Sequence, residues 1–76
     1  MTMFTYTDKN GRIHNANVAS AHVITAGESR DGTWTLAFHY GKDYDVTCRF
    51  ASFAEMRDDL RAQLGPGYMK LIGLRE

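Results

Sequence analysis

Residues 33–55 read TWTLAFHYGKDYDVTCRFASFAE, which predicts a strand, a tight turn, a second strand and the start of a helix. In residues 34–40 and again in residues 44–50, large apolar side chains alternate with polar or small ones. A period of two is typical of strands that present one apolar face and one polar face. Residues 41–43 place a glycine and two polar residues between them, so the stretch predicts two antiparallel strands joined by a tight turn.

The loop length sets the register of this predicted hairpin. With residues 41–43 as the loop, the facing pairs are Trp34 with Phe50, Leu36 with Cys48, Phe38 with Val46, His39 with Asp45, and Thr35 with Arg49. Each apolar residue then faces an apolar partner, which supports the register. The register also directs Cys48 into the core, where a lone cysteine acts as a small hydrophobic residue rather than a reactive thiol.

The same stretch ends in the start of a helix. Ser52 and Glu55 have the spacing of a capping box, whose side chains satisfy free backbone amides at a helix N-terminus. We expect the helix to run from about residue 53 to about residue 64, with Gly65 in a left-handed cap and Pro66 unable to continue it. Its apolar stripe consists of Phe53, Met56, Leu60 and Leu64.

A second hairpin is predicted near the beginning of the chain. Phe4 and Tyr6 alternate with threonines, and the sequence DKNG of residues 8–11 fits a type I turn whose glycine takes a positive φ. In that register Phe4 faces Ala16 and Tyr6 faces His14, so the apolar side chains share one face. A competing two-residue turn would exchange the faces, and we therefore prefer the first register.

Two more segments complete the predicted fold. Residues 20–26, SAHVITA, are β-branched enough for a third strand, either separate or joined to the second through a bulge, and residues 68–74 form a last short strand. The sequence thus predicts one α+β domain over residues 1–76. Its architecture is a four- to five-stranded antiparallel meander sheet, with one α-helix packed across one face and a short C-terminal segment.

One helix is too small to cover such a sheet. A helix of ~12 residues is about 18 Å long and roughly 10 Å wide. Four strands spaced ~4.8 Å apart make a sheet about 19 Å across, so the helix covers roughly half of its apolar face. We expect the remainder to be covered by residues 68–74, by a second copy of the chain or by a foreign partner, because large uncovered apolar patches usually mark interaction sites.

Composition and charge disfavour several classes of protein. The 76 residues include nine basic and nine acidic side chains, for a formal net charge of +0, whereas nucleic-acid binders normally carry a basic excess. One cysteine allows no internal disulfide, which suits a reducing cytosol. The N-terminus lacks the features of a signal peptide, and no segment approaches the ~20 apolar residues needed to span a bilayer. We expect a cytoplasmic protein that does not contact membranes, and the balanced charge disfavours a nucleic-acid partner without excluding one.

Motifs for catalysis, cofactors or metals are not found. Residues 27–33 have glycines spaced as in a phosphate loop, but Thr33 stands where the lysine belongs and no long helix follows. The three histidines and Cys48 share no metal-ligand spacing. Asp58 and Asp59 are adjacent on the predicted helix and project about 100° apart, which does not suit a catalytic pair. We expect no enzymatic activity, no cofactor and no metal.

The end of the second predicted hairpin is the best surface candidate for binding. His39 and Asp45 face each other there as an exposed cross-strand pair, and two tyrosines flank the turn with a lysine at its tip. The predicted partner-binding residues are His39, Tyr40, Lys42, Tyr44 and Arg30. The tyrosines are equally consistent with an apolar hairpin end that has no binding role.

The sequence favours a non-enzymatic protein–protein interaction protein, of the stand-alone accessory or inhibitor type that phages and mobile elements carry. The first alternative is a structural subunit that self-associates through the open sheet face or an edge strand. The second is a weak single-stranded nucleic-acid binder that uses Trp34 and the tyrosines to stack on bases.

Overall fold

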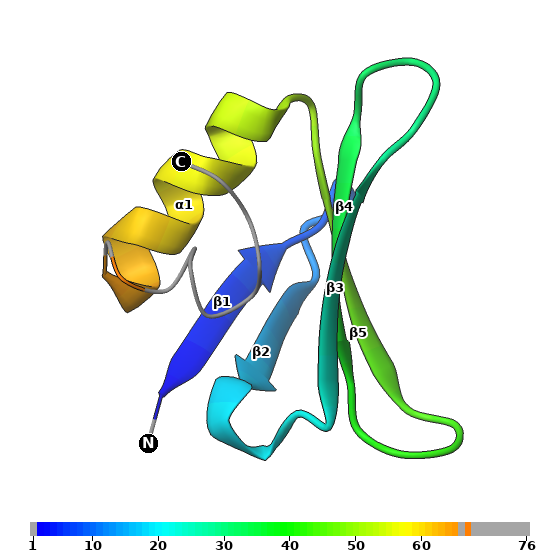
Figure 1. Cartoon of the computed structure of the whole chain (residues 1–76), viewed down its shortest axis with the longest axis vertical. Helices are drawn as coiled ribbons and strands as arrows, with labels where there is room; N and C mark the ends of the chain where they lie inside the picture. Colours follow the sequence, from blue (N-terminus) through cyan, green and yellow to red (C-terminus); the bar gives the residue numbers. More distant parts are fainter. Residues whose placement is uncertain (1, 66, 68–76) are drawn as a thin grey trace.

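Figure 1 shows a computed structural model of the chain, in which residues 2–65 and 67 are described. The elements in chain order are β1 (Met3–Thr7), β2 (Ile13–Asn17), the short 3₁₀ helix η1 (Val18–Ser20), β3 (Val23–Glu28), β4 (Trp34–His39), β5 (Asp45–Phe50) and α1 (Phe53–Leu64). The strands form a two-stranded sheet, β1-β2, and a three-stranded sheet, β3-β4-β5, both antiparallel. The α+β class is confirmed, but the single four- to five-stranded meander is wrong.

The sheet is split because the chain changes layer after β2. Val18–Ser20 makes a 3₁₀ turn, and Val18 is buried with its N–H donating to the carbonyl of Thr2 at 2.9 Å. The turn ends the β1-β2 ladder, so β3 begins a second sheet instead of extending the first. The third strand begins at Val23 and includes Gly27, whereas the sequence predicted a strand over residues 20–26.

The β1-β2 hairpin and α1 lie on the same side of the three-stranded sheet (Figure 1). The ring centroids of Phe4 and Phe38 are 5.7 Å apart, and those of Tyr6 and Phe50 are 5.8 Å apart. Residues on the inner face of β4 and β5, such as Leu36, are fully buried. The hairpin therefore covers the part of the apolar face that the helix leaves open. The expected role of residues 68–74 in this closure lies outside the described residues.

Both predicted hairpin registers are confirmed. Phe4 faces Ala16 in the first hairpin, and Trp34 faces Phe50 in the second. Gly11 has φ 82°, and its N–H donates to the carbonyl of Asp8 at 3.0 Å, as the type I turn with a positive-φ glycine requires.

The helix also has its predicted limits, Phe53–Leu64. The Ser52 hydroxyl accepts a hydrogen bond from the N–H of Glu55 at 3.2 Å. Gly65 has φ 91° and ψ 163°, so it takes the positive φ expected of a glycine stop but with an extended ψ in place of the left-handed helical value.

Three side chains tie the layers together. The Tyr40 hydroxyl donates to the Asn17 carbonyl at 2.9 Å, and the Tyr6 hydroxyl donates to the Arg49 carbonyl at 3.2 Å. Gln63 on α1 bonds the backbone of β1. These contacts hold the β1-β2 hairpin over the three-stranded sheet. They also place the tip of the hairpin beside the outer edge of β5.

Candidate partner-binding site

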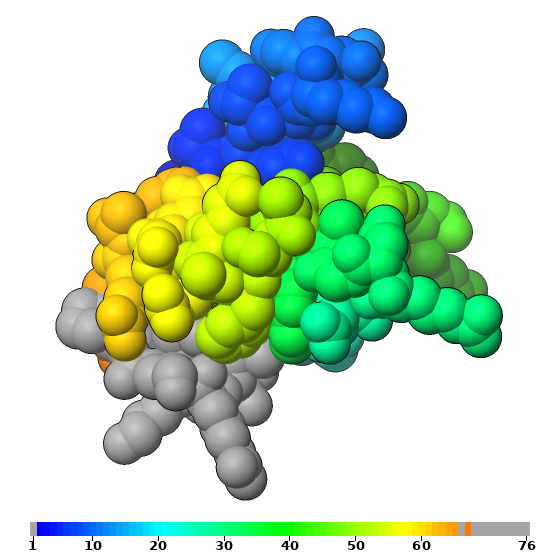
Figure 2. Space-filling model, turned by 90° about the horizontal axis from the view of Figure 1, so that it is seen from above, coloured from blue at the N-terminus to red at the C-terminus, as the bar shows by residue number. Residues whose placement is uncertain are grey.

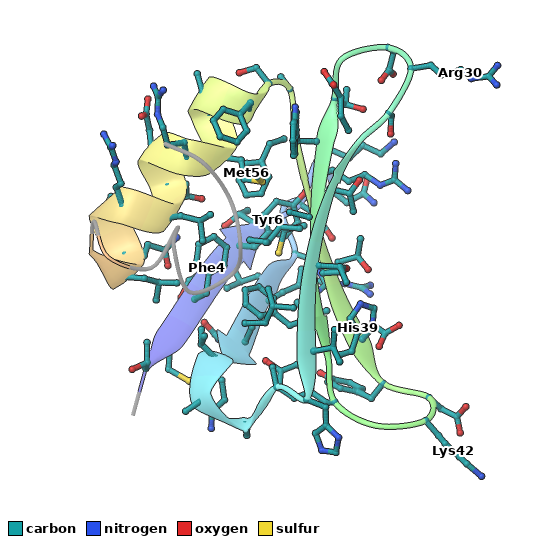
Figure 3. All side chains as sticks on the ribbon, in the orientation of Figure 1. Phe4, Tyr6, Arg30, His39, Lys42 and Met56 are labelled. Carbon is teal, nitrogen blue, oxygen red and sulfur yellow. The ribbon has the colours of Figure 1, made fainter. Side chains whose placement is uncertain are left out.

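The five predicted partner-binding residues do not form one site. Figure 3 shows Arg30 in the β3–β4 loop and Lys42 in the β4–β5 loop, at opposite ends of the three-stranded sheet. His39 lies toward the Lys42 end of the sheet (Figure 3). Four of the predicted residues can therefore belong to one surface, and Arg30 cannot join it.

His39 is held by two neighbours on the outer face of the sheet. Its Nδ1 lies 2.9 Å from Oδ1 of Asp45, and its Nε2 lies 3.1 Å from Oγ1 of Thr25. The predicted His39–Asp45 pair is present, and Thr25 from β3 adds a contact that the sequence did not reveal. Both ring nitrogens of His39 already have partners, one on β3 and one on β5. The side chain is therefore better suited to holding the three strands together than to binding a ligand.

The two tyrosines at this end have different surroundings. Tyr40 is half-buried, and burial raises the pKa of its hydroxyl, with smaller contributions from Tyr44 and Cys48. Its hydroxyl therefore stays protonated at neutral pH and holds Asn17. Tyr44 packs its ring 5.7 Å from that of Tyr40 but remains 62% exposed. Tyr44 is thus the more exposed of the two tyrosines on this surface.

The outer edge of β5 has backbone groups that no described strand pairs. The N–H of Tyr40 donates to the carbonyl of Tyr44 at 2.9 Å, so these residues are a hydrogen-bonded pair of the β4-β5 ladder. Hydrogen-bonded and non-hydrogen-bonded pairs alternate in an antiparallel ladder. The N–H and C=O groups of Asp45, Thr47 and Arg49 therefore point away from β4, toward the free edge.

An open cleft of about 780 Å³ adjoins this edge. It lies where the tip of the β1-β2 hairpin, which projects from the body of the molecule in Figure 2, passes beside β5. The cleft is lined by Tyr6, Thr7, Asp8, Lys9, Asn10, His14, Thr47 and Arg49. One wall is therefore the β5 edge itself, and the opposite wall is the hairpin.

The acidic side chain at the tip of the β1-β2 hairpin, Asp8, has its hydrogen-bond partners within the hairpin itself. Oδ2 of Asp8 lies 3.0 Å from Nε2 of His14, and Oδ1 accepts from the backbone N–H groups of Asn10 and Arg12, each at 2.9 Å. The hydrogen bond to His14 is the largest cause that lowers the pKa of the Asp8 carboxyl, followed by the bond from the Arg12 backbone. Asp8 is therefore a structural anion of the turn.

The basic side chains of the cleft are less constrained by neighbouring charges than Asp8 is. Within residues 2–65 and 67, neither Lys9 nor Arg49 forms an ion pair, although the charge of Arg49 makes a small contribution to lowering the pKa of Asp31. Both side chains line the cleft. The rim therefore has two cations available to a ligand, while the one carboxylate there is already bonded.

The structure offers little for metal or nucleophilic chemistry in its described part. Residues 2–65 and 67 contain no group of three or more potential metal ligands among His, Cys, Asp and Glu side chains. Cys48 is fully buried, and this burial raises the pKa of its thiol to about 12. The thiol is therefore protonated at neutral pH and packs as the predicted core residue.

Over the same part of the chain, no helix has both the length and the apolar character that crossing a membrane requires.

The cleft was missed at the sequence level because its walls are far apart in the chain. Lys9 and His14 belong to one hairpin and Thr47 and Arg49 to another, and no pattern indicated that the hairpin tip would lie beside β5. The outward backbone groups of β5 could have been inferred from the sequence, because the predicted register already determined which of them face away from β4. No family model matches the sequence, and the searches of curated proteins and of solved structures gave no match.

Proposed function

We propose that this protein is a non-enzymatic protein-binding domain that accepts an extended polypeptide segment along the outer edge of β5. The observation that carries the proposal is the edge at Asp45 and Thr47, which borders an open cleft and which no element within residues 2–65 blocks. An extended peptide can add a strand to such an edge through main-chain hydrogen bonds, and adjacent pockets then select its side chains.

The surroundings of the edge specify the chemistry of the segment. Lys9 and Arg49 provide positive charge at the cleft end, and Tyr44 provides an exposed ring at the other end. β5 has six residues, which corresponds to a length of about 20 Å for a paired strand. The site therefore suits an extended segment with an acidic side chain near Arg49 and an apolar side chain near Tyr44.

A second edge that no described strand pairs, on β3, is a weaker candidate. By the same alternation, Ile24, Ala26 and Glu28 direct their backbone groups away from β4. The cleft borders β5 and not β3, and no basic residue lies within Val23–Glu28 to orient an acidic segment. The β3 edge offers backbone pairing alone, which gives affinity without selection.

Nucleic-acid binding has less support in the structure than in the sequence. The ring of Trp34 packs at 5.0 Å from that of Phe53 in an edge-to-face arrangement, and Tyr40 is bonded to Asn17. Two of the aromatic residues expected to stack on bases are thus used within the fold. An accessory or inhibitor role in the cytoplasm fits a small domain with one buried cysteine and a protein-binding edge, and it remains part of the proposal.

A proline substitution at the centre of the edge tests the proposal. Thr47→Pro removes an N–H that points away from β4, so the β4-β5 ladder keeps its hydrogen bonds while strand addition is blocked. The matched control Thr47→Ala keeps the N–H. Circular dichroism and a urea titration establish that both variants are folded.

The assay selects ligands from a random-peptide display library on the immobilised protein. We expect enriched peptides with acidic residues that bind the wild-type protein and Thr47→Ala alike, and that lose at least about tenfold in affinity with Thr47→Pro. Equal binding of the enriched peptides to Thr47→Pro, or no enrichment at all, would exclude the β5 edge as the binding site.

A further inference from the structure

We infer that the segment which best fits the β5 edge is β5 of a second copy of this chain, added antiparallel across a two-fold axis at Thr47. The inference rests on the proposed function, because it identifies the partner of the same edge. It would join the two three-stranded sheets into one continuous sheet through an isologous interface, in which the same strand contacts itself.

The ladder geometry restricts the possible registers. Only the residues at positions 45, 47 and 49 direct backbone groups outward, so these positions must meet their equivalents on the second copy. Centring the axis on Thr47 pairs Thr47 with itself and Asp45 with Arg49 of the second copy. This register uses the outward groups of all three residues, and every pairing falls within Asp45–Phe50.

The side chains in this register are complementary. Asp45 and Arg49 alternate with the buried Val46 and Cys48, so both charged side chains project from the outer face of the sheet, as does Thr47. Each copy then contributes one carboxylate and one guanidinium to two cross-strand ion pairs, with a threonine pair between them, and both kinds of pair stabilise antiparallel sheets. Moving the axis to Cys48 would place Arg49 opposite Thr47 and remove the charge match.

The groups needed for this pairing are accessible. The side chain of Asp45 is half exposed, and its bond to His39 uses Oδ1, which leaves Oδ2 for an arginine. The carbonyl of Arg49 accepts from the Tyr6 hydroxyl at 3.2 Å, and a carbonyl oxygen has a second lone pair for the N–H of an added strand. The cleft of about 780 Å³ beside Arg49 provides room for the end of that strand.

Charge reversal tests both the interface and its register. Asp45→Arg places two positive charges opposite each other in the homodimer, and Arg49→Asp places two negative charges opposite each other. In an equimolar mixture, one chain presents two arginines and the other two aspartates, so every cross-strand pair is again opposite in sign. Sedimentation velocity from about 1 μM to about 1 mM gives the dissociation constants, and circular dichroism verifies that each variant is folded.

We expect the wild-type protein to dimerise within this range, each single variant to dimerise at least about tenfold more weakly, and the mixture to form a 1:1 heterodimer with wild-type affinity. A wild-type protein that stays monomeric throughout, variants that dimerise like the wild type, or a mixture that stays monomeric would each overturn the inference. A strictly monomeric protein that still selects acidic peptides through Thr47 would refute only this inference. Peptide binding that is unaffected by Thr47→Pro would refute the proposed function itself.

Discussion

The side-chain amide of Gln63 pairs with both backbone groups of Thr5. Its Oε1 accepts from the N–H of Thr5 at 2.7 Å, and its Nε2 donates to the carbonyl of Thr5 at 2.9 Å and to Oδ1 of Asp59 at 2.7 Å. The amide thus occupies the outer edge of β1 as a neighbouring peptide group would. Exposed strand edges invite pairing with other chains, so the protein covers the edge of β1 at this point. On β5 the Tyr6 hydroxyl bonds the outward carbonyl of Arg49, but no described residue bonds the outward backbone groups of Asp45 and Thr47.

Replacing Gln63 with glutamate tests this contact. The Gln63→Glu variant loses the donor to Thr5 and Asp59 and brings two carboxylates together, so we expect it to destabilise the protein by about 1–2 kcal/mol. Urea unfolding measures the loss, and the amide of Thr5 should exchange its hydrogen faster. Ala62→Gln is the control, because it places a glutamine one position earlier on an exposed part of the same helix.

The hydrogen bond from Tyr40 to Asn17 predicts a difference between two neighbouring tyrosines. Tyr40→Phe removes a part-buried bond of 2.9 Å between the two sheets, and we expect a loss of about 1 kcal/mol. Tyr44→Phe removes an exposed hydroxyl on the ring that packs against Tyr40, and it should change stability by less than about 0.5 kcal/mol. Equal losses for the two variants in urea titrations would contradict the assigned role of Tyr40.

Closure of the core by the hairpin predicts a large effect at Phe4. This residue is fully buried and packs 5.7 Å from Phe38, so Phe4→Ala should destabilise the protein by about 3–5 kcal/mol. Ile13→Ala on the same hairpin, where the side chain is 62% exposed, should change stability by less than about 0.5 kcal/mol. A small effect at Phe4 would mean that the hairpin does not seal the core.

The Asp8 turn predicts a dependence of stability on pH. The pKa of Asp8 is lower in the folded protein than its ordinary value of about 3.9, so its contribution is complete above about pH 4 and disappears as the pH falls through the folded value. The difference in stability between the wild-type protein and Asp8→Asn should therefore shrink between about pH 4 and pH 2 in urea titrations. A difference that stays constant or grows on acidification would contradict the lowered pKa.

His14 is the largest cause of that lowered pKa. The His14→Phe variant removes the imidazole that bonds Asp8 and keeps the two backbone donors of the turn. Asp8→Asn should therefore have a weaker pH-dependent effect in the His14→Phe background than in the wild type.

The local structure could be predicted from the sequence because it depends on patterns within short segments. Alternating apolar residues and the turn at Gly11 defined the first hairpin, and the pairing of Trp34 with Phe50 followed from the length of the second turn. Ser52 and the glycine at position 65 gave the helix limits. Each of these features is determined by residues close together in the chain.

The arrangement of the layers could not be predicted in the same way. A period of two identifies the apolar face of a strand but not the strand beside it, so the sequence did not reveal that η1 would end one sheet and begin another. The sequence predicted that the helix would leave part of the apolar face uncovered, and the hairpin that packs over this face had been assigned to the sheet itself. The cleft beside Arg49 was missed for the same reason.

Amide hydrogen exchange along β5 in the bound state shows directly whether a strand is added at this edge. In the free protein, the amides of Val46, Cys48 and Phe50 should exchange slowly because they pair with β4, while those of Asp45 and Thr47 exchange fast. In a complex, with a selected peptide or with a second copy, the amides of Asp45 and Thr47 should become protected as well. If they continue to exchange as fast as in the free protein, no strand is added at this edge, and β5 is not the binding site.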